Sequence, residues 1–108
     1  MMEAVVICLA LNLYHEARGE PVVGQIAVSQ VVLNRVKDDR YPNTVCEVVR
    51  QAQYSKINGK LLLKRCQFSW FCDGRSDRPK DVKAFKWSYK LSKRILAGEF
   101  SDLVHGAT

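Results

Sequence analysis

The sequence predicts one domain of the α+β class over residues 1–108, mostly helical, with about four helices and a small antiparallel β-hairpin. Two long apolar-periodic segments near the start indicate packed helices, and a third, amphipathic segment lies near the end. Asn58-Gly59, between two strand-like runs, is the strongest short-range hairpin signal. With 108 residues, 47% of them hydrophobic, the chain can form one modest core, and no linker or repeat divides it.

The first helix is predicted from about Glu3 to Ala17. Its first half is apolar nearly all round, which is typical of a helix buried on several sides. Gly19 is expected to form a left-handed cap, and Pro21 cannot continue the helix. The segment carries the acidic Glu3, has no small-residue cleavage site and is shorter than the roughly 20 apolar residues of a membrane span. We therefore expect a core helix and no export signal in this chain.

Two further helices are predicted in the middle of the chain. Residues 23–36 have apolar side chains at helical spacing, although their high β-branched content makes a strand the competing interpretation; the length favours a helix. Thr44 and Glu47 match a capping box, with Thr44 as N-cap and Glu47 reaching back. This box is expected to open a short helix that ends at about Gln53.

The hairpin and a last helix complete the prediction. Strand-like runs at 54–57 and 60–63 flank Asn58-Gly59, and residues 66–72 either extend this sheet or form one wall of a cleft. A helix is predicted over about 80–97, stopped by Gly98. Its inner stripe is expected to consist of Val82, Phe85, Tyr89, Ser92 and Leu96.

The four cysteines allow three pairings. Cys8 lies within an apolar helix and is expected to be a buried free thiol. Cys66 and Cys72 bracket a short loop and are candidates for a disulfide, with Cys46 as a competing partner. The cysteine spacing matches no zinc site, and His15 and His105 do not complete one. We therefore expect neither a metal nor a cofactor.

The net charge of +6 favours an anionic partner: nucleic acid, an acidic membrane face or an anionic wall polymer. The basic residues are scattered in ones and twos, so a solvated surface is the preferred interpretation. No helix gathers Arg and Lys on one side, which argues against nucleic-acid binding.

Glu16 is the leading candidate for a catalytic residue. It lies near the end of the first helix, where partial burial and the negative end of the helix dipole both favour a protonated carboxyl group. Such a group is suited to general acid catalysis, as glycoside cleavage requires. The alternative is a surface glutamate at a helix end.

Glu20, four residues further on, has two open interpretations. It either faces the cleft as a second carboxylate or stabilises the turn, pairing with Arg18 or Arg35. A separation of about 5 Å between the two carboxyl groups would suit a retaining hydrolase, and about 6.5–9.5 Å an inverting one.

The remaining candidates are polar and aromatic side chains that could bind sugar or serve the scaffold. Gln25 and Asn34 carry amides on the second helix; Ser69 could bind sugar or Glu16 but lacks partners for a nucleophile. His15 is expected to be structural. Four aromatic residues are either sugar-stacking surfaces or core, with about two in each role: Tyr54, Phe68, Trp70 and Phe71.

Several blocks of the sequence resemble the SleB-type cell-wall hydrolases, the catalytic domains of spore-cortex-lytic enzymes and related phage and bacterial lysins. The likeness extends from about Asn12 to the end, with the blocks in order: Tyr14-His-Glu-Ala-Arg-Gly-Glu-Pro21, Gly24-Gln25, Val32-Leu-Asn-Arg-Val36, Gln67-Phe-Ser69 and Gly106-Ala-Thr108.

The resemblance implies a lysozyme-like domain that cleaves peptidoglycan between N-acetylmuramic acid and N-acetylglucosamine. Such enzymes act as lytic transglycosylases and leave a 1,6-anhydro end, and the family's essential acid falls on Glu16. Gln67 would belong to the substrate site, and Ala107 and Thr108 would line the cleft. The implied partner is peptidoglycan, acted on at the cell wall by a monomer, without nucleic acid or membrane insertion. The alternatives are hydrolysis with water and a non-catalytic basic module that binds the wall or nucleic acid.

The chain also departs from the family pattern. Residues 53–65 form a longer link than usual, so the hairpin is expected to be a local addition. Family members continue beyond Gly-Ala-Thr with an aromatic-containing strand, and we expect this wall of the cleft to be clipped or supplied differently.

Overall fold

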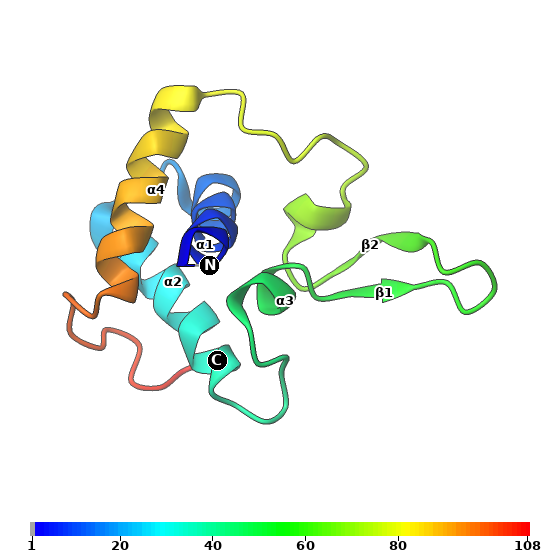
Figure 1. Ribbon diagram of the computed structural model, residues 1–108, viewed down its shortest axis with the longest axis horizontal. Coiled ribbons are helices and arrows are strands. Elements are labelled where there is room, and N and C mark those ends of the chain that lie inside the picture. The colour runs from blue at the N-terminus through cyan, green and yellow to red at the C-terminus, as the bar shows by residue number, and fades with distance from the viewer. Residues whose placement is uncertain (1) are drawn as a thin grey trace.

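The computed structural model describes residues 2–108 and confirms the mostly helical α+β class, with four α-helices and one two-stranded antiparallel sheet among them (Figure 1). The elements in chain order are α1 (Met2–Ala17), α2 (Val22–Val36), α3 (Val45–Val49), β1 (Ala52–Tyr54), β2 (Leu61–Cys66), the short 3-10 helix η1 (Ser69–Cys72) and α4 (Val82–Leu96). No helix in the described part of the chain is long and apolar enough to cross a membrane.

Helix α1 forms the centre of the domain. Figure 1 looks almost along its axis, with α4 on one side of it and α3 on the other. It packs against α2, α3 and α4, and Leu9, Ala10 and Leu13 are at most 1% exposed. This placement explains why the helix is apolar nearly all round, as the sequence predicts.

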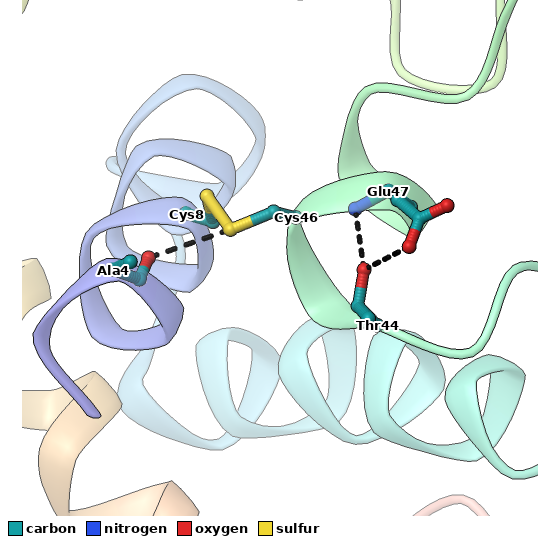
Figure 2. The surroundings of a disulfide bond; sticks show 5 residues. All are labelled: Ala4, Cys8, Thr44, Cys46 and Glu47. Carbon is teal, nitrogen blue, oxygen red and sulfur yellow. Dashed lines mark hydrogen bonds between the residues drawn. A yellow bond between two sulfur atoms is a disulfide. The ribbon is translucent and has the colours of Figure 1, made fainter. Parts of the chain in front are cut away.

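Side-chain caps begin α3 and α4. The Thr44 hydroxyl accepts a hydrogen bond from the Glu47 amide at 3.2 Å, and Asp81 caps α4 by accepting from the Ala84 amide at 3.0 Å. Glu47 does not reach back to a backbone amide; its carboxylate accepts from the Thr44 hydroxyl at 2.8 Å (Figure 2). Helix α3 ends at Val49 rather than Gln53, because the chain enters β1 at Ala52.

The hairpin is present, but its boundaries differ from the prediction. Tyr54 ends β1 instead of beginning a strand, and it pairs with Leu61 across an irregular register. Asn58-Gly59 lies inside a six-residue connection, closed by a 2.8 Å hydrogen bond from the Ser55 amide to the Lys60 carbonyl. The hairpin projects away from the helices (Figure 1).

Helix α4 faces the core with a stripe displaced from the predicted one. Val82 is 61% exposed, so its assignment to the inner stripe is wrong. The fully buried positions are Ser88, Leu91, Ser92 and Ile95; Phe85, Tyr89 and Leu96 are only partly buried. The two serines are small, which lets α4 approach α1 closely.

Two disulfides connect the elements. Cys8 bonds to Cys46 and joins α1 to the first turn of α3 (Figure 2), so the prediction of a free Cys8 thiol is wrong. The packing of α3 on α1 brings these two Cα atoms to 5.2 Å, a proximity that sequence spacing cannot show. The predicted Cys66–Cys72 pair is confirmed.

The two predicted glycine stops behave differently. Gly98 has a φ of +77° and ends α4 as expected. Gly19 does not adopt the left-handed conformation; instead the Glu20 amide donates to the Ala17 carbonyl at 3.0 Å, and this turn ends α1 before Pro21.

Candidate functional site

Glu16 lies in the last turn of α1, and its side chain is exposed to solvent on one side. The neighbouring protein nevertheless removes part of its hydration, and this burial raises the pKa of the Glu16 carboxyl group above its ordinary value. The charge of His15 acts in the opposite direction and is the smaller effect. The negative end of the helix dipole adds to the preference for the protonated form. The position thus combines access from solvent with a carboxyl group whose pKa is raised.

A polar and aromatic cluster holds the end of α1 against η1. The Trp70 indole nitrogen donates to the side-chain oxygen of Asn12 at 2.9 Å, and the His15 ring stacks on Trp70 at 4.8 Å with an interplanar angle of 14°. His15 Nε2 also lies 2.9 Å from the Asp77 carbonyl oxygen. Residues 12 and 16 are one turn apart on α1, so this cluster fixes the rim beside Glu16.

Trp70 therefore belongs to the core. It is 6% exposed, which leaves no ring face for a sugar. His15 has the structural role that the sequence suggests. Asn12 is fully buried and was not singled out from the sequence, although a lone amide in an apolar helix signals an internal hydrogen bond.

Gln25 is engaged at both ends of its amide. Its nitrogen donates to the Glu20 carbonyl at 2.9 Å, and its oxygen accepts from the Trp87 indole at 3.2 Å. The side chain is buried and links the α1–α2 turn to α4. This geometry supports the structural interpretation of Gln25 rather than direct contact with a sugar.

Glu20 is exposed in the turn after α1 and has neither predicted arginine partner. Among the side chains that the structure describes, the ion pairs are Arg40–Asp38 and Arg94–Glu99. Arg18 instead donates to the Tyr14 hydroxyl. The backbone of Glu20, through its contact with Gln25, is what stabilises this turn.

The Gln67-Phe68-Ser69 segment joins β2 to η1 and is closed by the Cys66–Cys72 disulfide. The Gln67 amide donates to the Gln51 carbonyl at 3.0 Å, whereas the side chains of Gln67 and Ser69 are exposed. Phe68 is partly buried, with the Arg35 guanidinium 5.4 Å from its ring centroid. The exposed side chains of this segment remain available to a ligand.

The C-terminal segment lies along α2, and three side chains of α2 hold it there. The Gln30 amide donates to the Ser101 carbonyl at 2.7 Å, the Asn34 amide to the Ala107 carbonyl at 3.0 Å, and Arg35 Nε to the Thr108 carbonyl at 2.7 Å. Arg35 thus connects Phe68 with Thr108, two residues from separate sequence blocks. Asn34 and Arg35 act as the scaffold of this segment.

Tyr54 lies apart from these groups. It is 51% exposed on the projecting hairpin and borders a hollow whose other walls come from α3 and from the residues before and after that helix. The structure therefore brings the end of α1 together with η1, and Phe68 together with Thr108, but places Tyr54 on a separate surface.

Asp77 is a second carboxyl group that sequence reasoning did not identify. It is partly buried, and this burial raises the pKa of its side chain; the charge of His15 lowers it, as it does for Glu16. His15 thus interacts with both groups. Asp77 lies in a loop of polar residues, where nothing in the sequence distinguishes it from its neighbours.

Comparison with known proteins places the chain in a family. The model of the cell wall hydrolase family matches residues 19–108, beginning three residues after Glu16. The spore cortex-lytic enzyme of Bacillus cereus is 51% identical over 41 residues, and those of Bacillus subtilis and Halalkalibacterium halodurans are 49% identical over the same length. These matches cover 38% of this chain and only 16%, 13% and 12% of the three relatives. No solved structure matches the chain significantly. Because the family model covers most of its length, the chain belongs to the cell wall hydrolase family.

Proposed function

We propose that this domain cleaves the glycan strand of peptidoglycan between N-acetylmuramic acid and N-acetylglucosamine, with Glu16 as the catalytic acid. The observation that carries the proposal is the position of Glu16: accessible at the end of the central helix, with a pKa raised by burial. Family membership and the spore cortex-lytic relatives support the same substrate class.

Glu16 would perform two proton transfers. The protonated carboxyl group donates its proton to the glycosidic oxygen as the bond to C1 of the muramic acid breaks. The resulting carboxylate accepts the proton of the muramic C6 hydroxyl, whose oxygen attacks C1 and closes the 1,6-anhydro ring. This lytic transglycosylase reaction consumes no water and returns Glu16 to its protonated state.

The two disulfides support action at the cell wall. Such bonds persist in oxidising compartments and are rare in the cytosol, so a wall enzyme working outside the cytoplasmic membrane suits this chain. We further propose that the domain acts as a monomer and binds no nucleic acid. A gel-shift measurement at low salt checks the latter point, because phosphate-driven binding is strongest there.

Digestion of purified peptidoglycan, followed by mass analysis of the fragments, tests the reaction. We expect soluble fragments with 1,6-anhydro-muramic ends. Glu16→Gln should abolish their release while leaving the thermal unfolding transition in place, whereas Glu20→Gln, the same change four residues away, should retain activity. A fully active Glu16→Gln variant would refute the assignment.

The fragment ends separate the two possible reactions. Reducing muramic ends would mean that water attacks C1, as in a muramidase, and would refute the transglycosylase step. Asp77→Asn adds a second test, because most glycosidases that add water use a second carboxylate. A transglycosylase with Glu16 as its single acid should retain most of its activity in this variant.

A further inference from the structure

The C-terminal end of α1 borders a strongly basic hollow that the proposed reaction does not use. Its volume is about 330 Å³, and its walls come from α1 and from the loop that leads into α4. Four of the lining side chains are cationic and one is a carboxylate. The residues around the hollow are Tyr14, His15, Arg18, Asp73, Arg75, Ser76, Arg78 and Lys80.

The loop that forms the outer wall is fixed to α1. The Asp77 carbonyl oxygen lies 2.9 Å from His15 Nε2, and the Asp81 amide donates to the Tyr14 hydroxyl at 2.9 Å. Within the loop, the Arg75 amide donates to the Asp73 carboxylate at 2.8 Å. The Arg78 backbone amide donates to the Ser76 hydroxyl at 3.2 Å and closes the following turn in the same way. These contacts hold the arginine-bearing backbone in place before any ligand arrives.

Four cationic side chains line the hollow against one carboxylate, so the hollow has an excess of positive charge. Ion pairs between described side chains involve Arg40 and Arg94, both elsewhere, and no cation of the hollow. The carboxylate of Asp73 is partly occupied by its own turn. Guanidinium groups match carboxylates in a two-point geometry, and several of them around one hollow can act on the same anion. The hollow is therefore suited to an anionic ligand.

We infer that this hollow binds a free carboxylate of the peptide stem carried by the glycan strand under cleavage. The inference rests on the proposed function and adds a specificity determinant to it. His15 lines the hollow, and Glu16 is the next residue of α1. Consecutive side chains on a helix point about 100° apart, so the Glu16 side chain points in a different direction from that of His15. The hollow thus opens beside Glu16 and suits a branch of the substrate rather than the sugar chain. Three extended residues span about 10 Å, which is enough for a stem to reach it.

The experiment compares two double variants on two substrates. Arg75→Gln with Arg78→Gln removes two charges from the hollow. Lys86→Gln with Lys90→Gln removes two charges from the exposed face of α4 and serves as the matched control. Both substrates are sacculi stripped of teichoic acid with hydrofluoric acid. In one, called untreated below, the stem carboxylates are left free. In the other they are converted to carboxamides by carbodiimide and ammonia.

On untreated sacculi we expect the Arg75/Arg78 variant to need about five- to tenfold more substrate for half-maximal release, with an unchanged maximal rate. The Lys86/Lys90 variant should match the wild type. On amidated sacculi, the wild type and the Arg75/Arg78 variant should need the same amount of substrate, because the carboxylate is gone.

The same substrate requirement for both proteins on untreated sacculi would overturn the inference. An Arg75/Arg78 defect that is equally large on amidated sacculi would overturn it too. A hollow that binds teichoic-acid phosphate would give the first of these results, because hydrofluoric acid has removed that phosphate from both substrates. Failure of the wild type to release fragments from any sacculi would instead reject the proposed function.

Discussion

Removal of the Cys8–Cys46 disulfide should destabilise the domain more than removal of Cys66–Cys72. The two bonds close loops of very different length, with sequence separations of 38 and 6 residues. Loop-closure entropy then gives a stabilisation of about 3.9 kcal/mol for the first bond and about 2.2 kcal/mol for the second at 25 °C. The difference of about 1.6 kcal/mol depends only on the ratio of the two lengths.

The comparison is well matched because each pair contains one deeply buried cysteine. Cys8 is 3% exposed and Cys72 is 1% exposed, so replacing either by alanine leaves a similar small void. The assay is urea unfolding of the two double alanine variants, monitored by circular dichroism and extrapolated to water. We expect the Cys8/Cys46 variant to have the lower free energy of unfolding.

Activity should respond in the opposite order. The short bond encloses the Gln67-Phe68-Ser69 segment beside η1, so its loss frees residues proposed to contact substrate. Measured well below both unfolding transitions, the Cys66/Cys72 variant should lose more peptidoglycan cleavage than the Cys8/Cys46 variant. If removing the short bond costs as much stability as removing the long one, loop closure is not the source of the stabilisation.

Four further measurements test Glu16 and the contacts around the end of α1. Because burial raises the pKa of Glu16, its contribution to stability is complete below the ordinary value of 4.5 and is lost as the pH rises through the folded-state pKa; Glu16→Gln should therefore equal the wild type at pH 3 and exceed it at pH 7 in urea unfolding. For the same reason, the rate of cleavage should fall on the alkaline side at a pH above 4.5, and an alkaline limb at or below 4.5 would contradict the acid role. Trp70→Phe strands the buried Asn12 oxygen and should cost about 1–3 kcal/mol, most of it recovered when Asn12→Leu is added. Trp87→Phe breaks only a partly buried hydrogen bond to Gln25 and should cost about 1 kcal/mol, with activity retained.

The sequence alone determined the helices, their approximate ends and the leading catalytic candidate. These features depend on local chemistry: apolar periodicity, the Thr44 cap, the Gly98 stop and the carboxyl group of Glu16 at the end of a buried helix. The Cys66–Cys72 pair was also a candidate from the sequence, because the two cysteines bracket a short loop. Each of these inferences involves residues close together in the chain.

Only the tertiary structure decided which distant residues meet. Cys8 found a partner because α3 packs on α1, and Trp70 entered the core because Asn12 offered it an acceptor. Arg18 and the basic side chains of the loop before α4 line one hollow because that loop is fixed to Tyr14 and His15. Contacts between residues far apart in sequence depend on how the helices pack together, and periodicity carries no information on that packing.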